Sequence, residues 1–266
     1  MTQPTIDTVK KSGTRFYVDP NDADNRLPGV TSILNMLPKP FLQYWRAKIV
    51  AECAADNLEI VTSMMLKGER EAAIDYLKKS PQRSTGNSAT IGTDVHNLCE
   101  RIARGEDVGR VHPDHRPYLV GFESFIKDFE PEFLFVEETV WSDTHKYAGS
   151  FDAIVKIDGE TICTDVKTTR SGVHSEVALQ LSAYSNADHI LKPDGSTVPI
   201  PTIDSCAVIH LRPERAQLVP VSNDPSLFDT FKSLRTVWEW DQGMSKRAVG
   251  KPVASWDIPE EKKGKR

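Results

Sequence analysis

Residues 149–167 hold the pattern that most constrains the fold of this chain. Apolar and β-branched residues alternate on both sides of Asp158-Gly159, and an Asp-Gly pair between such runs is a strong signal for a two-residue β-hairpin turn. Counting outward from this turn places Asp152 opposite Asp165, and the alternation of side chains puts Lys167 on the same face of the sheet. The sequence therefore predicts two carboxylates and one lysine on one face of a hairpin.

Two carboxylates directly opposite each other destabilise a sheet, because the Cα atoms of such a non-hydrogen-bonded pair are about 4.5 Å apart. A divalent cation held by oxygen ligands is the simplest compensation. Asp152 and Asp165 are therefore predicted metal ligands. The alternative is a surface hairpin with exposed charges. That alternative must explain why the charges share a face with Ile154 and Cys163, which suit a half-buried surface.

Composition limits the classes of protein that remain. Of the 266 residues 39% are hydrophobic and 27% charged, which predicts a soluble protein with a substantial core. No run approaches the roughly 18 apolar residues of a membrane span, and the polar residues 1–11 lack a signal-peptide core, so a cytoplasmic location is expected. Four scattered cysteines argue against a zinc knuckle or a disulfide framework. Because the net charge is −5, any contact with DNA must come from a local basic patch.

The order of the predicted elements favours an α/β (mixed α+β) fold with a mixed central sheet flanked by helices. We expect an irregular segment at 1–30, a helical region at 31–130 that covers the active site, a core at 131–243 and a flexible basic tail at 244–266. Helices are predicted at 32–36, 40–56, 60–79, 88–104, 114–129, 174–191 and 225–242, with a break over 80–88. Strands are predicted at 133–141, 147–157, 160–167, 205–212 and 216–222.

Two helical segments carry further candidates. Gln180 and Tyr184 are four residues apart and so neighbours on one face of a helix, although a packing helix with an incidental glutamine would look the same. His96 lies beside the apolar stripe of an earlier helix, where a lone histidine is more often simply a satisfied or exposed side chain. Neither segment indicates a function by itself.

Together with the hairpin, the combination resembles the PD-(D/E)xK nuclease superfamily in its RecB-like exonuclease branch. The matching residues are Asp152, then Asp165-x-Lys167-Thr, then Gln180-x-x-x-Tyr184, and ahead of them Gly92-x-x-x-His96. The resemblance covers about residues 88–190. It implies a restriction-endonuclease-like core, a metal ligand at His96, catalytic roles for Asp152, Asp165 and Lys167, and a role for Gln180 and Tyr184 in ordering the site and contacting DNA.

The opening Pro28-Gly29-Val30-Thr31-Ser32-Ile33-Leu34 is similar to the openings of phage-encoded members of this group, which would place the protein in a host cytoplasm. Some relatives hold an iron–sulfur cluster with one early cysteine and a late cysteine triplet. Here Cys206 is the last cysteine and no late triplet follows, so we predict no iron–sulfur cluster.

The predicted activity is metal-dependent hydrolysis of DNA by an exonuclease that admits a DNA end or a single strand. Asp152 and Asp165, with His96 and the carbonyl of Val166, would hold Mg²⁺ or Mn²⁺, and the nitrogen ligand favours Mn²⁺. Lys167 would orient the attacking water or stabilise the charge at phosphorus. Phosphate contacts are assigned to Arg170 and to a possible patch near the histidine helix, although solvated helix faces explain each arginine as well: Arg101, Arg104, Arg110 and Arg116.

Glu137 and Glu138 lie on the strand before the hairpin, and the sequence leaves open whether one faces the metal or both lie at a solvated sheet edge. Three alternatives to an exonuclease also remain. The first is an endonuclease of the same fold, and the second is a catalytically inactive DNA-binding or assembly protein, which would lack a ligand or the lysine. The third is an acid–base glycosidase, which would have no use for Lys167.

Overall fold

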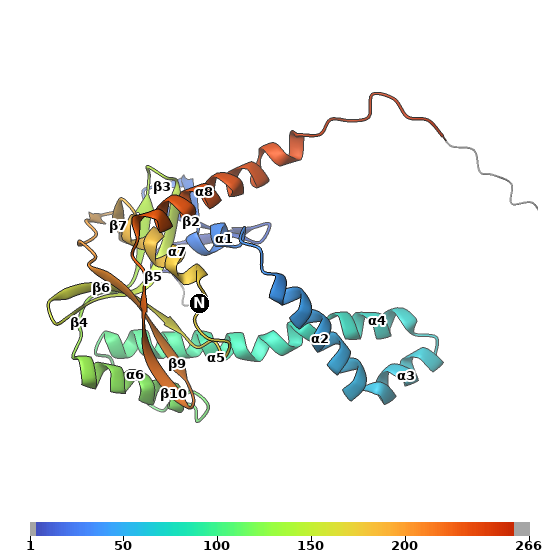
Figure 1. Ribbon diagram of the computed structural model, residues 1–266, viewed down its shortest axis with the longest axis horizontal. Coiled ribbons are helices and arrows are strands. Elements are labelled where there is room, and N and C mark those ends of the chain that lie inside the picture. The colour runs from blue at the N-terminus through green and yellow to red at the C-terminus, as the bar shows by residue number, and fades with distance from the viewer. Residues whose placement is uncertain (1–3, 258–266) are drawn as a thin grey trace, which may run out of the picture.

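The computed structural model describes residues 4–257, without the side chains of residues 85–89 (Figure 1). Its centre is a seven-stranded sheet in the order β10-β9-β6-β5-β4-β7-β8. β6 and β9 pair in parallel, and the other neighbours are antiparallel. The strands are β4 (Glu132–Ser142), β5 (Tyr147–Ile157), β6 (Glu160–Lys167), β7 (His189–Leu191), β8 (Thr197–Val198), β9 (Ser205–Arg212) and β10 (Arg215–Val221).

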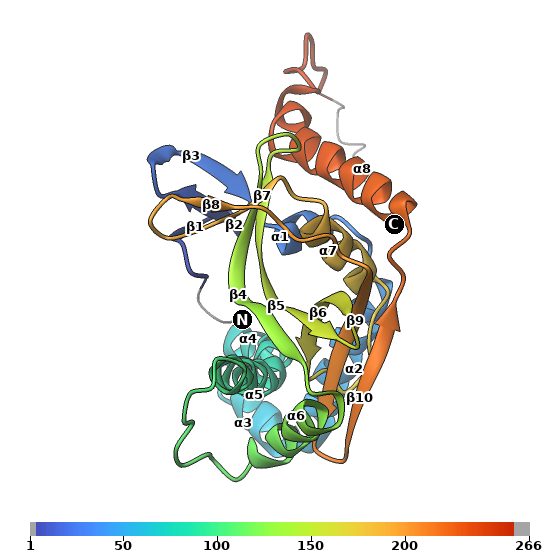
Figure 2. The same ribbon diagram turned by 90° about the vertical axis from the view of Figure 1, so that its left-hand side faces the viewer.

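Helices cover both faces of this sheet (Figures 1 and 2). One face packs against α1 (Val30–Leu34), α7 (Glu176–Ser185) and α8 (Pro225–Gln242). The other face packs against α5 (Ser80–Ala103) and α6 (Arg116–Phe129). The mixed α+β fold, with its helical region around residues 30–129, is thereby confirmed.

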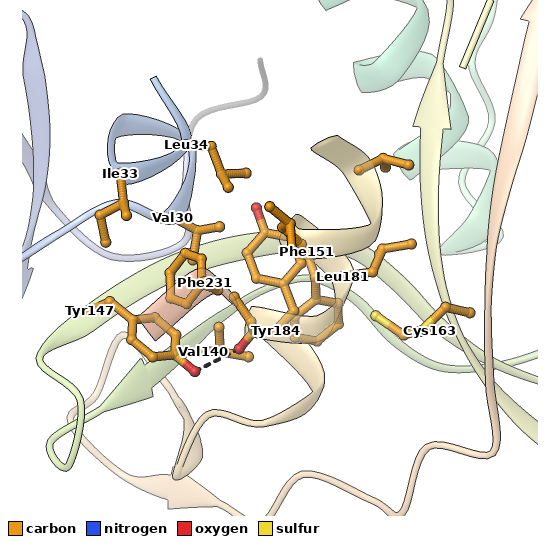
Figure 3. Packing of buried hydrophobic residues seen from close by; sticks show 14 of the residues in the cluster. Val30, Ile33, Leu34, Val140, Tyr147, Phe151, Cys163, Leu181, Tyr184 and Phe231 are labelled. Carbon is orange, nitrogen blue, oxygen red and sulfur yellow. Dashed lines mark hydrogen bonds between the residues drawn. The ribbon is translucent and has the colours of Figure 1, made fainter. Parts of the chain in front are cut away.

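The larger core lies between the sheet and α1, α7 and α8 (Figure 3). Leu181 of α7 and Phe231 of α8 are fully buried in it. The hydroxyl of Tyr147 donates a hydrogen bond of 2.7 Å to the carbonyl of Ala183, so the polar end of this buried ring is satisfied. This packing fixes α7 against the hairpin of β5 and β6, which is where the predicted site residues lie.

The prediction of an irregular segment at 1–30 is wrong. Residues 1–3 lie outside the described part, and the rest forms a three-stranded sheet of β1 (Thr8–Lys11), β2 (Thr14–Asp19) and β3 (Asp22–Pro28). Ser12 and Gly13 both have positive φ, 49° and 81°, as a type I′ hairpin turn requires, and this turn joins β1 to β2. The sheet is anchored because Tyr17 and Leu27 are buried against the ends of β4, β5 and β7.

Three boundaries in the helical regions also differ from the prediction. Residues 60–79 form two helices, α3 (Leu58–Leu66) and α4 (Arg70–Lys78), separated at Gly68, which has a φ of 77°. The predicted break over 80–88 is absent, because α5 begins at Ser80 and its Pro81 stands in the first turn, where a missing N–H costs nothing. The helix predicted to reach residue 191 ends at Ser185, and β7 pairs with β4 instead.

The helices α2 (Pro40–Asp56), α3 and α4 form an arm that projects away from the sheet (Figure 1). At the other end of the chain, part of the tail predicted at 244–266 is a short 3₁₀ helix (Met244–Arg247), and residues 258–266 lie outside the described part. Within residues 4–257, no helix combines the length and the apolar character that crossing a bilayer requires.

Candidate active site

The register of the central hairpin is the one that the sequence predicts. β5 and β6 pair from Ile157 opposite Glu160 as far as Ala153 opposite Thr164. The next two positions are Asp152 and Asp165, at the point where the ladder ends. There the Oδ2 atom of Asp152 accepts a hydrogen bond of 2.6 Å from the backbone N–H of Val166. Asp152 is therefore tied to the strand that carries the other carboxylate.

Asp165 is the buried centre of the site, with 2% of its surface exposed. The Nζ atom of Lys167 lies 2.9 Å from its Oδ1 and 2.7 Å from its Oδ2. The amide of Gln180 donates a second hydrogen bond of 3.0 Å to Oδ1. By contrast, Oδ2 accepts no hydrogen bond of good geometry from the described residues, although it is buried. This oxygen has the ammonium of Lys167 as its ionic partner and retains capacity for a further ligand.

The buried charges shift each other's pKa values. Burial raises the pKa of Asp165, and the carboxylate of Asp152 raises it further, while Lys167 and His96 oppose the shift. Burial alone would lower the pKa of Lys167, but Asp165 and Asp152 outweigh it and the pKa is raised. Lys167 is therefore a charged ammonium at neutral pH. Two carboxylates share this single lysine, so the site has room for further positive charge.

His96 reaches the same carboxylates from α5. Its Nδ1 atom lies 3.4 Å from Oδ2 of Asp152, and both side chains are about four-fifths buried. Gly92 stands one turn earlier, where a Cβ atom would lie 3.2 Å from the hydroxyl of Thr168. The absence of a side chain at Gly92 thus lets α5 approach the end of β6 and bring His96 to the site.

Gln180 and Tyr184 reach the site from α7. The amide of Gln180 bridges the two, because it donates to Asp165 and also, at 3.1 Å, to the hydroxyl of Tyr184. The buried ring of Tyr184 lies directly on Gly149, where a Cβ atom would be 2.6 Å from its Cε1. A glycine at 149 is therefore a packing requirement of this tyrosine.

These residues surround a cavity of about 120 Å³. Six of the predicted residues line it: His96, Asp152, Asp165, Lys167, Gln180 and Tyr184. Neither Val166 nor Arg170 is among the lining residues, which also include Arg15, Tyr17, Thr31, Glu137 and Ser150. Tyr17 of β2 is fixed there, since its hydroxyl accepts the N–H of Ser150 at 3.1 Å. The N-terminal sheet thus forms one wall of the site and adds Arg15 to its lining.

Of the two glutamates that the sequence left open, Glu137 belongs to the site. It is 4% exposed and lines the cavity beside His96 and Asp152. Its φ of 49° is uncommon for a residue other than glycine and costs about 1–3 kcal/mol, and such strain clusters at functional sites. Glu138 instead forms an ion pair with Lys192. The two adjacent glutamates in a predicted strand were the sequence signal for an acidic residue at the site. The sequence could not say which of the two faces the site, because it does not fix the register of β4 against β5.

The predicted arginine contacts are not gathered at the cavity. Arg170 is exposed in the loop after β6 and is not among the lining residues. Three of the four arginines near the histidine helix pair with acidic neighbours: Arg101 with Glu106, Arg104 with Glu100, and Arg116 with Glu123. Within the described part of the chain, these arginines are better explained as solvated helix faces than as a phosphate-binding patch.

The donor types suit a hard divalent cation, although the arrangement is not a closed metal site. Among the described residues, no three His, Cys, Asp or Glu side chains lie close enough together to hold a metal ion. Instead, Lys167 and Gln180 engage Asp165, and His96 lies against Asp152. The buried Oδ2 of Asp165, the oxygen-rich donor set and the nearby imidazole nevertheless fit Mg²⁺ or Mn²⁺.

Comparison with known proteins adds little to this geometry. No protein-family model and no curated protein matches the chain. A solved structure titled "Crystal structure of SSO0001" matches with 17% sequence identity and a TM-score of 0.33, over 68% of this chain and 70% of that chain. A likeness at this level carries no argument, so inferences about function rest on the residues of the site.

Proposed function

We propose that this chain is a metal-dependent deoxyribonuclease that hydrolyses phosphodiester bonds from DNA ends, as an exonuclease in DNA recombination, repair or phage DNA processing. The observation that carries the proposal is that α5, β5 and β6 bring His96, Asp152, Asp165 and Lys167 to one cavity. In the RecB-like nucleases, which the sequence resembles, these residue types do this chemistry. A chain that had lost the activity would be free to lose one of the four.

Phosphodiester hydrolysis needs an activated water and stabilisation of charge on the phosphoryl oxygens. Bound Mg²⁺ or Mn²⁺ supplies a Lewis acid and a more acidic water. Asp152 and Asp165, with His96 and the carbonyl of Val166, are the groups that would hold it. Glu137 lines the same cavity and would add a third carboxylate near the ion. No iron–sulfur cluster forms part of the proposal.

The other polar groups have separate tasks. Lys167, as an ammonium, would act through its charge on the phosphoryl oxygens or by orienting the water. Gln180 holds Asp165 in place and, with Tyr184, positions the DNA strand. Arg170 is available only at the periphery, where it would meet a phosphate further along the strand.

The direct test is incubation with end-labelled DNA, linear and circular, single- and double-stranded, with Mn²⁺, Mg²⁺ or a chelator. We expect metal-dependent loss of linear DNA while circular DNA persists. Cleavage of circular DNA would make the protein an endonuclease of the same fold. Binding of DNA without hydrolysis under every metal condition would contradict the proposal and favour a DNA-binding or assembly protein.

His96 tests the metal site separately. His96→Ala is expected to raise the Mn²⁺ concentration that gives half-maximal activity, because one ligand of the ion is lost. His112, exposed in the loop after α5 and absent from the cavity, provides the matched control His112→Ala. An unchanged Mn²⁺ titration for His96→Ala would refute its role as a ligand.

A further inference from the structure

We propose that a second cavity beside the candidate active site binds one unpaired nucleoside of the DNA, next to the scissile phosphate. The inference rests on the proposed nuclease function and specifies the kind of DNA end that the site accepts. This second cavity has a volume of about 230 Å³ and shares Thr31, Lys167 and Gln180 with the first. Lys167 therefore stands at the boundary between the two, within reach of a phosphate whose nucleoside lies in the second cavity.

The floor of the second cavity is apolar. Leu34 of α1 and Val177 of α7 line it and are each 4% exposed, and the half-buried Val173 continues the same surface. These side chains belong to the main core or pack against it, so the floor is rigid. An apolar surface of this kind suits the face of a nucleobase, and it does so without regard to the sequence of the DNA.

His174 lines the cavity and stacks on Phe41, which is not itself a lining residue. His174 and Phe41 lie nearly parallel, with an interplanar angle of 7° and ring centroids 5.7 Å apart. A contact of 2.8 Å between His174 Nε2 and the hydroxyl of Ser171 fixes the orientation of the imidazole. Phe41 is nevertheless 54% exposed, which is unusual for a ring held in place. A ring pair that is fixed and still open to solvent offers a stacking surface for a base.

An ion pair closes the outer wall. The Nζ atom of Lys39 lies 3.2 Å from each carboxylate oxygen of Glu176, which ties the start of α2 to the start of α7. Lys39 and Lys167 thus line the same cavity, each paired with a carboxylate, and a DNA phosphate would share or replace that partner. The apolar floor would take the base, and the two ammonium groups would take the phosphates.

The size of the cavity decides between paired and unpaired DNA. Pockets for drug-sized ligands have volumes of about 300–1,000 Å³, so a space of about 230 Å³ holds one nucleoside and excludes a base pair. The nucleotide at the cleavage point must therefore leave its duplex before the phosphate reaches Lys167. The expected substrates are single strands and frayed ends, with blunt duplex ends cleaved more slowly.

The first experiment measures kcat/KM on single-stranded oligonucleotides that are intact or carry one abasic residue beside the cleavage position. We expect the abasic residue to lower kcat/KM about tenfold with the wild-type protein, the size of one lost base-stacking contact. His174→Ala and Phe41→Ala should lower it similarly on intact DNA, and neither should add to the abasic loss. Phe129→Ala, an exposed phenylalanine at the end of α6, is the matched control and should change nothing.

The second experiment needs no hydrolysis. Oligonucleotides with 2-aminopurine as their 5′- or 3′-terminal base are titrated with protein in the presence of a chelator. Stacking in the cavity should quench the fluorescence for one of the two ends. Val173→Trp, which fills the cavity from its wall, should abolish the quenching while circular dichroism remains that of the wild type.

The two experiments separate failure of this inference from failure of the nuclease proposal. If the wild-type protein cleaves no DNA, the proposed activity fails, and the 2-aminopurine titration still decides whether the cavity binds a base. Equal kcat/KM values on intact and abasic DNA would overturn the inference. So would equal effects of His174→Ala and Phe129→Ala, or quenching that Val173→Trp leaves intact.

Discussion

The hairpin of β5 and β6 and the arm of α2, α3 and α4 are opposite kinds of structure. In the hairpin most side chains are buried, and helices pack on both of its faces. In the arm, which the structure describes in full, only Ala73 is buried. The arm instead exposes large apolar side chains such as Tyr44, Leu58 and Leu66.

The contrast shows where the free energy of folding and the chemistry are concentrated. Local stability follows the density of buried apolar contacts, so the arm is expected to open long before the hairpin does. The candidate site lies entirely on the rigid side of this division, apart from Lys39 and Phe41 at the start of α2. Precise positioning of two carboxylates and a lysine needs such a rigid setting.

The largest contrast is expected in activity. Lys167→Ala should lower the rate constant for hydrolysis about 10²–10³-fold, because a positioned charge at the phosphoryl group is lost. Asp152→Ala should abolish hydrolysis, because a metal ligand is lost. Lys67→Ala, an exposed lysine at the end of α3, is the matched arm variant and should cleave normally. The measurement is the single-turnover rate on end-labelled DNA, and cleavage retained by either site variant would remove that residue from the mechanism.

The next contrast concerns stability. Leu181→Ala in α7 removes a side chain that is fully buried and should lower the free energy of unfolding by about 2–5 kcal/mol. Leu66→Ala in the arm, where the leucine is 84% exposed, should change it by less than about 0.5 kcal/mol. Urea denaturation followed by circular dichroism compares the two. Equal losses would mean that the arm is packed against something in solution.

The hairpin was predictable because its information is local. The Asp-Gly turn fixes the register, the register fixes which residues share a face, and the structure has the same pairing. The strand boundaries of β5, β6 and β9 and the helix α8 follow from equally local patterns. Thus the placement of Asp152, Asp165 and Lys167 relative to each other needed no knowledge of the rest of the fold.

Other parts of the site depend on contacts between distant segments. Arg15 and Tyr17 reach the cavity because the N-terminal sheet docks on β4, β5 and β7, and nothing in residues 1–30 indicates that partner. Glu137 lines the cavity with a positive φ of its own, and the regular alternation of side chains along a strand does not predict such a conformation. Arg170 was assigned to the site by nearness in sequence, but its loop turns it to solvent.

Gly149 of β5 tests how tightly α7 packs on the hairpin. Gly149→Ala should cost about 1–3 kcal/mol of stability, since the added methyl group would lie 2.6 Å from the ring of Tyr184, which is itself buried. Gly250→Ala is the control, because nothing lies within 4 Å of a Cβ atom there. Thermal unfolding of both variants measures the difference. A Gly149→Ala protein as stable as the control would show that α7 moves freely over β5.

The smallest effect is expected at Asp188, at the exposed rim of the rigid half. Partial burial alone would raise its pKa, but hydrogen bonds from the N–H of Thr144 (2.8 Å) and the hydroxyl of Ser142 (3.1 Å) outweigh it, and the pKa is lowered. A lowered pKa stabilises the fold above the carboxyl's unfolded pKa of about 3.9, and the contribution disappears as the pH falls through the folded value.

Asp188→Asn should therefore destabilise the protein at pH 7 by less than about 1 kcal/mol, since the side chain is exposed and screened by solvent. The difference from wild type should shrink as the pH falls from about 4 through the lowered folded pKa, because the carboxylate of the wild type then becomes a neutral carboxyl group. Free energies of unfolding across this pH range measure it, with Asp56→Asn, at the exposed end of α2 in the arm, as the control. A difference that stays constant with pH would show that the hydrogen bonds from Thr144 and Ser142 stabilise the turn between β4 and β5 without any contribution from the charge. This turn would then respond to acid no differently from the arm.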